Sequence, residues 1–178
     1  MRVVGGIHRG RILYRVEKPT TRETADMVKV AVFNMLQIHS GVVLDLYAGS
    51  GAYGIEALSR GADFCYFVDM DKDAIQTVIK NLKMLKIEDQ AKVFQHTDER
   101  FIKGLDESIK FDVIFLDPPY DDENYQEVIS KLQSHLNTGG YIVCESKKQT
   151  EIDLEIQDLE KIKNKTYGIK RITIFQKK

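Results

Sequence analysis

The segment Asp117-Pro118-Pro119-Tyr120 combines residue types that can hold an aromatic amine. Two consecutive prolines fix two φ angles and remove two backbone N–H donors, which leaves a stiff loop whose carbonyl groups accept without competition. The Asp117 carboxylate and the Pro118 carbonyl offer two acceptors, and Tyr120 offers a flat face. A proline-stiffened strand end without further role would explain the prolines but not the flanking acid and tyrosine. We therefore predict that Asp117, Pro118, Pro119 and Tyr120 are catalytic.

Methylation of an exocyclic base amine would use these groups. The lone pair of guanine N2, adenine N6 or cytosine N4 is delocalised into the ring, so the amine is a poor nucleophile. Two acceptors that hold its hydrogens orient the nitrogen toward a methyl donor, and such alignment supplies much of the rate without a covalent intermediate. Stacking on Tyr120 would contribute about 1–3 kcal/mol. Bases in DNA and RNA both fit this chemistry, once unpaired or flipped out; with Asn in place of Asp, so do some protein glutamines.

A glycine-rich segment points to a nucleotide-like cofactor. Gly49, Gly51 and Gly54 match the pattern G-x-G-x-x-G of dinucleotide-binding proteins. Asp45 precedes them at the end of a strand-like run. A carboxylate there would oppose a pyrophosphate bound at a helix N-terminus, a position that favours anions, but it suits the ammonium group of S-adenosylmethionine. A tight turn without any ligand is the plainer alternative for the glycines.

The second strand-like run ends in Val68-Asp69-Met70-Asp71. An acid such as Asp69 can accept hydrogen bonds from both hydroxyls of a ribose, which NAD and S-adenosylmethionine share. The Asp-Pro-Pro-Tyr segment has no role in hydride transfer, so S-adenosylmethionine is the favoured cofactor and an NAD oxidoreductase the distant alternative. Asp71 is expected to cap the helix that follows it.

The elements that would position these residues alternate along the chain. Near-continuous apolar strands that alternate with helices predict a Rossmann-like α/β fold, a parallel sheet covered on both faces, with ligands beyond the carboxyl ends of the strands. The segment Lys147–Lys165 is expected to be an irregular insert. Strands are expected at 42–46, 64–68, 91–95, 111–116, 141–145 and 169–175, and helices at 20–38, 51–59, 71–84 and 125–136.

Length and composition fit one globular domain over residues 1–178. The 178 residues are 43% hydrophobic and 30% charged, a profile typical of folded rather than disordered chains. No apolar run approaches the roughly 20 residues of a membrane span, and none at the N-terminus resembles a signal peptide. Cys65 and Cys144 lie in apolar runs, as small core residues in a reducing compartment do. We expect a cytoplasmic protein without a metal site.

The first residues are basic although the chain has a net charge of −1. Residues 2–5 and 11–16 read as a hairpin, so residues 1–20 form an extension to a catalytic core at 21–178. Thr20 and Glu23 form a capping box for the first long helix. The basic face could meet RNA phosphates locally, with an ordinary solvated surface as the alternative. The candidate phosphate contacts are Arg2, Arg9, Arg11 and Arg22.

Several segments spread over the whole chain carry a resemblance. They are Met1 to Gly6 with Gly10-Arg11, Thr21-Arg22 with Val28-Lys29 and Phe33-Asn34, Asp45 to Gly51 with Glu56 to Ala62, Asn81-Leu82, and Asp117 to Tyr120. Together they resemble the RsmD family, bacterial methyltransferases of the N2 amine of a guanine in 16S ribosomal RNA. The resemblance implies S-adenosylmethionine as cofactor, 16S ribosomal RNA as partner, a monomer, a seven-stranded sheet with an antiparallel last strand, and a hairpin that faces RNA.

The resemblance also implies the cofactor site. Asp98, after the third strand, would lie by the adenine, and a helix cap is its alternative role. The residues predicted to bind the cofactor are Asp45, Tyr47, Ala48, Gly49, Ser50, Gly51, Asp69, Met70 and Asp98.

The chain departs from the family before the first long helix. Glu23 and Met27 stand where relatives have Pro and Arg, whereas Arg22 and Asp26 are retained. Met27 in place of Arg removes a positive charge that could contact RNA. A methyltransferase of another base amine in RNA or DNA, and a non-catalytic RNA-binding or ribosome-assembly protein, are therefore the alternatives.

Overall fold

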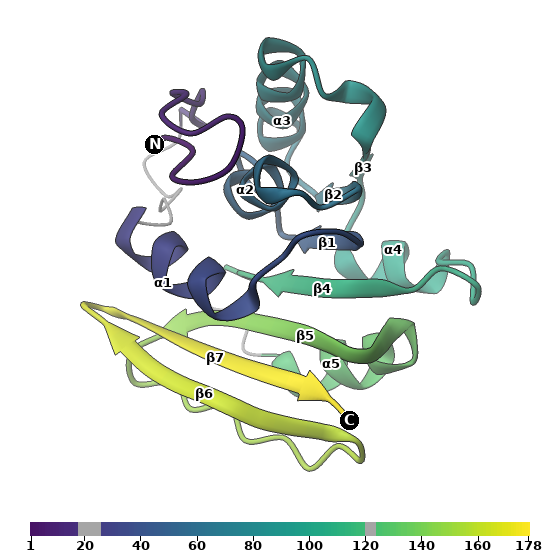
Figure 1. Ribbon diagram of the computed structural model, residues 1–178. Helices are drawn as coiled ribbons and strands as arrows, with labels where there is room; N and C mark the ends of the chain where they lie inside the picture. Colours follow the sequence, from purple (N-terminus) through teal and green to yellow (C-terminus); the bar gives the residue numbers. More distant parts are fainter. Residues whose placement is uncertain (18–25, 120–123) are drawn as a thin grey trace.

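A seven-stranded sheet forms the centre of the computed structural model, which describes residues 1–17, 26–119 and 124–178 (Figure 1). The strands are β1 (Val42–Leu46), β2 (Phe64–Asp69), β3 (Ala91–Gln95), β4 (Phe111–Leu116), β5 (Leu136–Lys147), β6 (Leu159–Tyr167) and β7 (Lys170–Lys177). Their order is β3-β2-β1-β4-β5-β7-β6. Strands β1 to β5 are parallel, and β7 is antiparallel to β5 and β6. The predicted α/β class and antiparallel last strand are confirmed.

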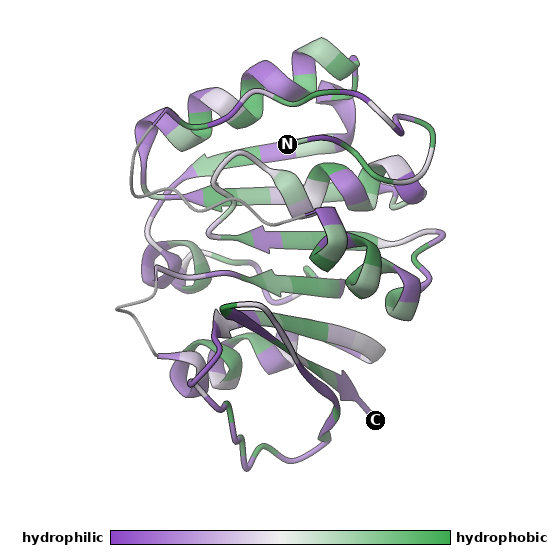
Figure 2. Cartoon of the chain, turned by 90° about the vertical axis from the view of Figure 1, so that its left-hand side faces the viewer, coloured by the Kyte–Doolittle hydropathy of each residue, from purple (hydrophilic) through white to green (hydrophobic). Residues whose placement is uncertain are grey.

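Helices cover both faces of the sheet (Figure 1). They are α1 (Asp26–Leu36), α2 (Ala52–Arg60), α3 (Lys72–Leu85), α4 (Asp98–Lys103) and α5 (Tyr125–Leu132), with 3₁₀ turns at Glu88–Gln90 and Gln133–His135. Alternate residues of a strand point to opposite faces. Phe115 of β4 therefore packs in the core shared with α1, α2 and α3, and Ile114 in the core shared with α5. Figure 2 shows hydrophobic residues concentrated in these central strands.

The topology fixes where a ligand site belongs. The strand order reverses beside β1, since β2 lies on one side of it and β4 on the other. In such sheets ligands bind beyond the carboxyl ends of the strands at this point. Those ends lie at the left in Figure 1, on the side where α1 begins.

Three expectations about the C-terminal half were wrong. Strand β6 (Leu159–Tyr167) begins inside the expected irregular insert at 147–165 and runs two residues beyond it. Its mostly polar side chains gave no strand pattern, and lysines are typical of an exposed edge strand. The helix predicted to reach Leu136 ends at Leu132 and continues as a 3₁₀ turn. Strand β5 starts at Leu136 and not at residue 141 as expected; it passes through Gly139 and Gly140 at a register shift against β4, where a bulge accommodates glycine.

The N-terminal arm, which we define as residues 1–17, is only partly the hairpin expected. Arg2 and Ile12 form an isolated antiparallel bridge, and Val3 N donates to the Arg11 carbonyl at 3.0 Å. No regular strand forms in the described part of this arm. The predicted capping box at Thr20 and Glu23 lies outside the described residues.

The two cysteines are buried and free, as core residues. No helix of the described part of the chain is long and apolar enough to cross a membrane.

Gly54 of α2 is needed for close packing of that helix on the sheet. A Cβ at Gly54 would lie 2.3 Å from Phe67 Cε1 and 2.6 Å from Cys65 Sγ. We expect Gly54→Ala to lower the free energy of unfolding by about 1–3 kcal/mol, because overpacking displaces buried neighbours. Chemical denaturation measures this change. Gly104→Ala is the control, since a Cβ there meets nothing closer than 3.4 Å. Equal stability of the two variants would contradict the packing role.

Candidate functional site

The glycine loop, which we define as residues 47–51, leads from β1 into α2 and is held against the end of β2. Tyr47 N donates to the Val68 carbonyl at 3.0 Å. Gly49 and Gly51 have φ angles of 56° and 83°, which side chains with a Cβ rarely adopt. Tyr47 has a φ of 70° although it is not a glycine. Backbone strain of this kind clusters at ligand sites.

Asp45 of β1 lies just before this loop in the sequence and contacts the helix that follows the loop. Its carboxylate accepts a hydrogen bond from Gly54 N at 2.9 Å, and only 2% of the residue is exposed. Burial raises the pKa of Asp45 to about 7, the Gly54 hydrogen bond opposes this rise, and the nearby Asp69 carboxylate adds to it. A carboxylate so disposed gains from a neighbouring cation.

Asp69, at the end of β2, links the loop to the next helix. Its two carboxylate oxygens accept from Gly49 N at 2.8 Å and from Asp71 N at 2.9 Å. A carboxylate has about four lone-pair sites, so Asp69 can accept further hydrogen bonds. Met70, beside it, is 68% exposed. Asp71 caps α3 by accepting from Asp73 N at 2.8 Å, which confirms the predicted cap.

Asp98 is brought to the glycine loop by α4. Tyr47 Oη donates to Asp98 Oδ2 at 2.6 Å, which joins residues predicted separately for the cofactor site. The alternative role as helix cap belongs to Thr97, whose hydroxyl accepts from Arg100 N at 3.2 Å. Asp98 occupies the first turn of α4 instead.

Two further loop residues face inward. Ala48 and Ser50 are both buried. Ala48 N donates to the Val68 carbonyl at 2.9 Å, and the Ser50 carbonyl accepts from Asn81 Nδ2 of α3 at 3.0 Å. These contacts fix the path of the loop.

Asp117, Pro118 and Pro119 follow β4, the strand beside β1. Asp117 is partly exposed, Pro118 is buried and Pro119 is exposed. Burial raises the pKa of the Asp117 carboxyl well above its usual range, the Glu145 carboxylate raises it further, and Lys170 opposes the rise. Tyr120 lies outside the described residues.

A small hollow joins the glycine loop to the Asp-Pro-Pro segment. It lies where the ends of β1 and β4 meet the start of α5, and it places Tyr47 opposite Pro118. Its lining residues are Tyr47, Leu116, Pro118, Asn124, Tyr125 and Val128. One residue predicted for the cofactor, Tyr47, and one predicted for the amine, Pro118, therefore lie beside the same small hollow.

A buried polar network on β5 that the sequence analysis missed acts electrostatically on Asp117. Glu145 is 1% exposed; it accepts from Tyr53 Oη at 2.9 Å and pairs with Lys170. The Tyr125 hydroxyl donates to the Glu145 carbonyl at 2.7 Å. Glu145 ends the predicted fifth strand, so the rule that placed Asp45 and Asp69 would have found it. Lys170 could not be recognised in the sequence as a partner of Glu145, because the β6–β7 hairpin that brings it there was not predicted.

The charges of the site fit a cationic ligand. Asp45 lies near the end of β1, Asp69 ends β2 and Asp98 follows β3, which are three adjacent strands. Within residues 1–17, 26–119 and 124–178 none of the three acids forms an ion pair. Uncompensated carboxylates beside a loop with open space at Gly49 suit a nucleoside with a cationic side chain better than a pyrophosphate.

The arginines predicted to contact RNA are spread along the arm. Arg2 Nε pairs with Asp26 at 2.9 Å, and Arg11 donates weakly to the Met84 carbonyl at 3.4 Å. Arg9 is exposed on the turn beside the C-terminal end of α2, a helix length of about 14 Å from the glycine loop. Arg22 lies outside the described residues.

Comparison with known proteins gives consistent matches. A family described as Conserved hypothetical protein 95 matches residues 1–176. Ribosomal RNA small subunit methyltransferase D of Haemophilus influenzae is 35% identical over 99% of this chain and 93% of the relative. YlbH of Bacillus subtilis is 39% identical over the whole of both chains. The solved structure of Escherichia coli yhhF is similar with a TM-score of 0.87 and 30% identity over 100% of this chain and 98% of that one.

Proposed function

The chain belongs to the family of Conserved hypothetical protein 95, the RsmD family, and we propose that it methylates the N2 amine of a guanine in 16S ribosomal RNA. It is an S-adenosylmethionine-dependent methyltransferase. The observation that carries the amine chemistry is the Asp117-Pro118-Pro119 segment, which follows β4 beside β1 and whose Pro118 lines a small hollow together with Tyr47 of the glycine loop. The full-length likeness to a relative named for small-subunit ribosomal RNA supports the substrate.

We assign the cofactor to the glycine loop and the acids around it. Bound S-adenosylmethionine supplies an electrophilic methyl group on a sulfonium sulfur. The Asp45 carboxylate favours its cationic end, and Asp69 has acceptor capacity left for the ribose hydroxyls. Asp98, which accepts a hydrogen bond from Tyr47, and the exposed Met70 lie on the side where the adenine of the cofactor would bind. The remaining loop residues, Ala48, Gly49, Ser50 and Gly51, set the backbone path.

Asp117 and Pro118 orient the target amine. The Asp117 carboxylate and the Pro118 carbonyl accept its two hydrogens, which aligns the nitrogen lone pair for attack. The raised pKa of Asp117 makes the carboxylate a better acceptor for the proton that the nitrogen loses. Pro119 stiffens the loop, and Tyr120 is proposed to stack on the base.

Cofactor affinity should depend on the protonation of Asp45. Its pKa is raised to about 7, and a bound cation lowers that value, so binding releases a proton below pH 7. Affinity is therefore expected to rise several-fold from pH 5.5 to pH 7 and then level off, by linkage. Isothermal titration of S-adenosylmethionine measures this. The variant Asp45→Asn should bind more weakly and lose the dependence; the same pH profile in both proteins would contradict the role of Asp45.

The substrate is tested by transfer of radiolabelled methyl groups. The acceptors are naked 16S RNA, small ribosomal subunits that lack the modification, and DNA. Label in RNA or subunits but not in DNA supports the proposal, and the comparison of naked RNA with subunits shows which form is recognised. Label in DNA alone overturns the RNA assignment. Monomeric state and the assembled subunit as substrate remain predictions.

A further inference from the structure

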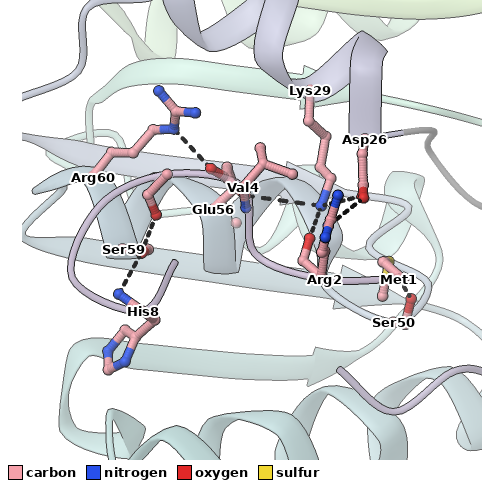
Figure 3. Close-up of polar contacts among 12 residues, drawn as sticks. Met1, Arg2, Val4, His8, Asp26, Lys29, Ser50, Glu56, Ser59 and Arg60 are labelled. Atoms are coloured by element: carbon pink, nitrogen blue, oxygen red, sulfur yellow. Dashed lines mark hydrogen bonds and ion pairs between the residues drawn. The ribbon is translucent and has the colours of Figure 1, made fainter. Parts of the chain in front are cut away.

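The N-terminal arm is fastened to the body of the protein close to the glycine loop. At its start, Ser50 Oγ donates to Met1 Sδ at 3.7 Å (Figure 3). Next, Val4 N donates to Glu56 Oε2 of α2 at 2.8 Å. Val3 and Leu13 are buried in the core. The arm is thus packed against the same elements that shape the loop.

Asn81 of α3 joins the far end of the arm to the loop. Its side chain is fully buried, and Oδ1 accepts from Tyr14 N at 2.7 Å. Its Nδ2 donates to the Tyr14 carbonyl at 3.1 Å and to the Ser50 carbonyl at 3.0 Å. A primary amide is the side-chain group that offers two donors and an acceptor together, as this position uses.

The contact of Asn81 with Tyr14 of the arm and its contact with Ser50 of the loop depend on each other, because one side chain makes both. A buried amide that loses some of its partners is costly, and satisfied networks specify one orientation. If the arm detaches, Asn81 loses its partners on Tyr14, and its orientation toward Ser50 is no longer fixed. The loop must then become ordered when a ligand binds, which weakens binding.

We propose that Asn81 is a positioning residue that makes binding of the cofactor at the glycine loop depend on the docked N-terminal arm. The inference rests on the proposed function, since it takes the loop to hold S-adenosylmethionine. A ligand that favours the docked arm, such as RNA phosphates at its arginines, then tightens cofactor binding, and the effect is reciprocal.

The test is isothermal titration of S-adenosylmethionine into the full chain without RNA. Asn81→Ala is expected to raise the Kd about tenfold, as loss of one or two hydrogen bonds does. Leu13→Ala, which removes a buried side chain of the arm and leaves the residues of the loop and Asn81 unchanged, should raise the Kd several-fold. The double variant should bind more tightly than the product of the two single effects predicts, because the arm reaches the loop through Asn81 as well as through the weaker Met1–Ser50 contact. Thr77→Ala is the control on the same helix, since its hydroxyl donates to the Asp73 carbonyl of that helix at 2.7 Å on the exposed side.

Each other outcome counts against the proposal. A wild-type Kd in Asn81→Ala overturns it, and so do independent, multiplying effects of the two substitutions. Should Asn81→Ala not fold, as judged by thermal unfolding, Leu13→Ala decides alone, and wild-type affinity overturns the inference. Absence of binding to the wild-type chain overturns the assignment of the loop itself. The titrations contain no RNA, so their results do not change if the proposed RNA or base is wrong. Failure of the inference about Asn81 can therefore be told apart from failure of the proposed substrate.

Discussion

Replacing Asp117 with alanine is expected to lower the turnover of methyl transfer by about a hundred- to thousandfold, the usual loss when one preorganised polar group is removed from the reacting centre. The carboxylate is the side-chain acceptor at the end of β4, and burial together with Glu145 raises its pKa, which strengthens it as a proton acceptor. Single-turnover kinetics at saturating cofactor measure the chemical step without product release.

Two comparisons separate this role from a structural one. Asp117→Ala should bind S-adenosylmethionine with an affinity within about threefold of wild type, because Asp45, Asp69 and Asp98 remain in place. Asp117→Asn keeps an acceptor oxygen and should retain more activity than the alanine variant. Wild-type turnover in Asp117→Ala would remove this residue from the mechanism.

Replacing Glu56 with alanine is expected to lower the free energy of unfolding by about 3–5 kcal/mol, the cost of breaking a buried ion pair from one side. Glu56 accepts from Arg60 at 2.7 Å and lies 3.8 Å from Lys29, and the side chains of Glu56 and Lys29 are both 0% exposed (Figure 3). Burial already lowers the pKa of Lys29, and Glu56 opposes that effect. Such a loss is a large part of the stability of a typical domain.

The matched control is Glu127→Ala. Glu127 and Lys131 form an ion pair with the same i, i+4 spacing as Glu56 and Arg60, but on an exposed face of α5. Exposed pairs contribute little, so the denaturation midpoint of this variant should equal that of wild type. A similar loss of unfolding free energy in Glu56→Ala and Glu127→Ala would show that burial is not what makes the ion pairs of Glu56 with Lys29 and Arg60 important for stability.

The sequence allowed prediction of the strands that position the site, because β1, β2 and β4 are apolar on both faces and each is followed by chemically distinctive residues. Strand β6 could not be recognised, since an exposed edge strand lacks the alternation that burial imposes. The register shift in β5 depends on how it meets β4, which is a long-range contact.

The candidate site divides in the same way. Asp45, Asp69 and Asp117 were identified because each lies at or beside the carboxyl end of a strand. The contact of Tyr47 with Asp98 and the ion pair of Glu145 with Lys170 join residues distant in sequence, and no local pattern signals them. The pairing of Asn81 with Tyr14 is of this kind too, so Asn81 could be noted as a family residue but not given a role.

Nucleoside analysis of the product identifies the atom of the base that the protein methylates. Small-subunit RNA lacking the modification would be incubated with the protein and S-adenosylmethionine carrying a deuterated methyl group, digested to nucleosides and analysed by mass spectrometry. The label is expected in N2-methylguanosine, and it should be lost when Asp117→Ala replaces the wild-type protein. Label in a methylated adenosine or cytidine, or in a guanosine methylated at another atom, would contradict it.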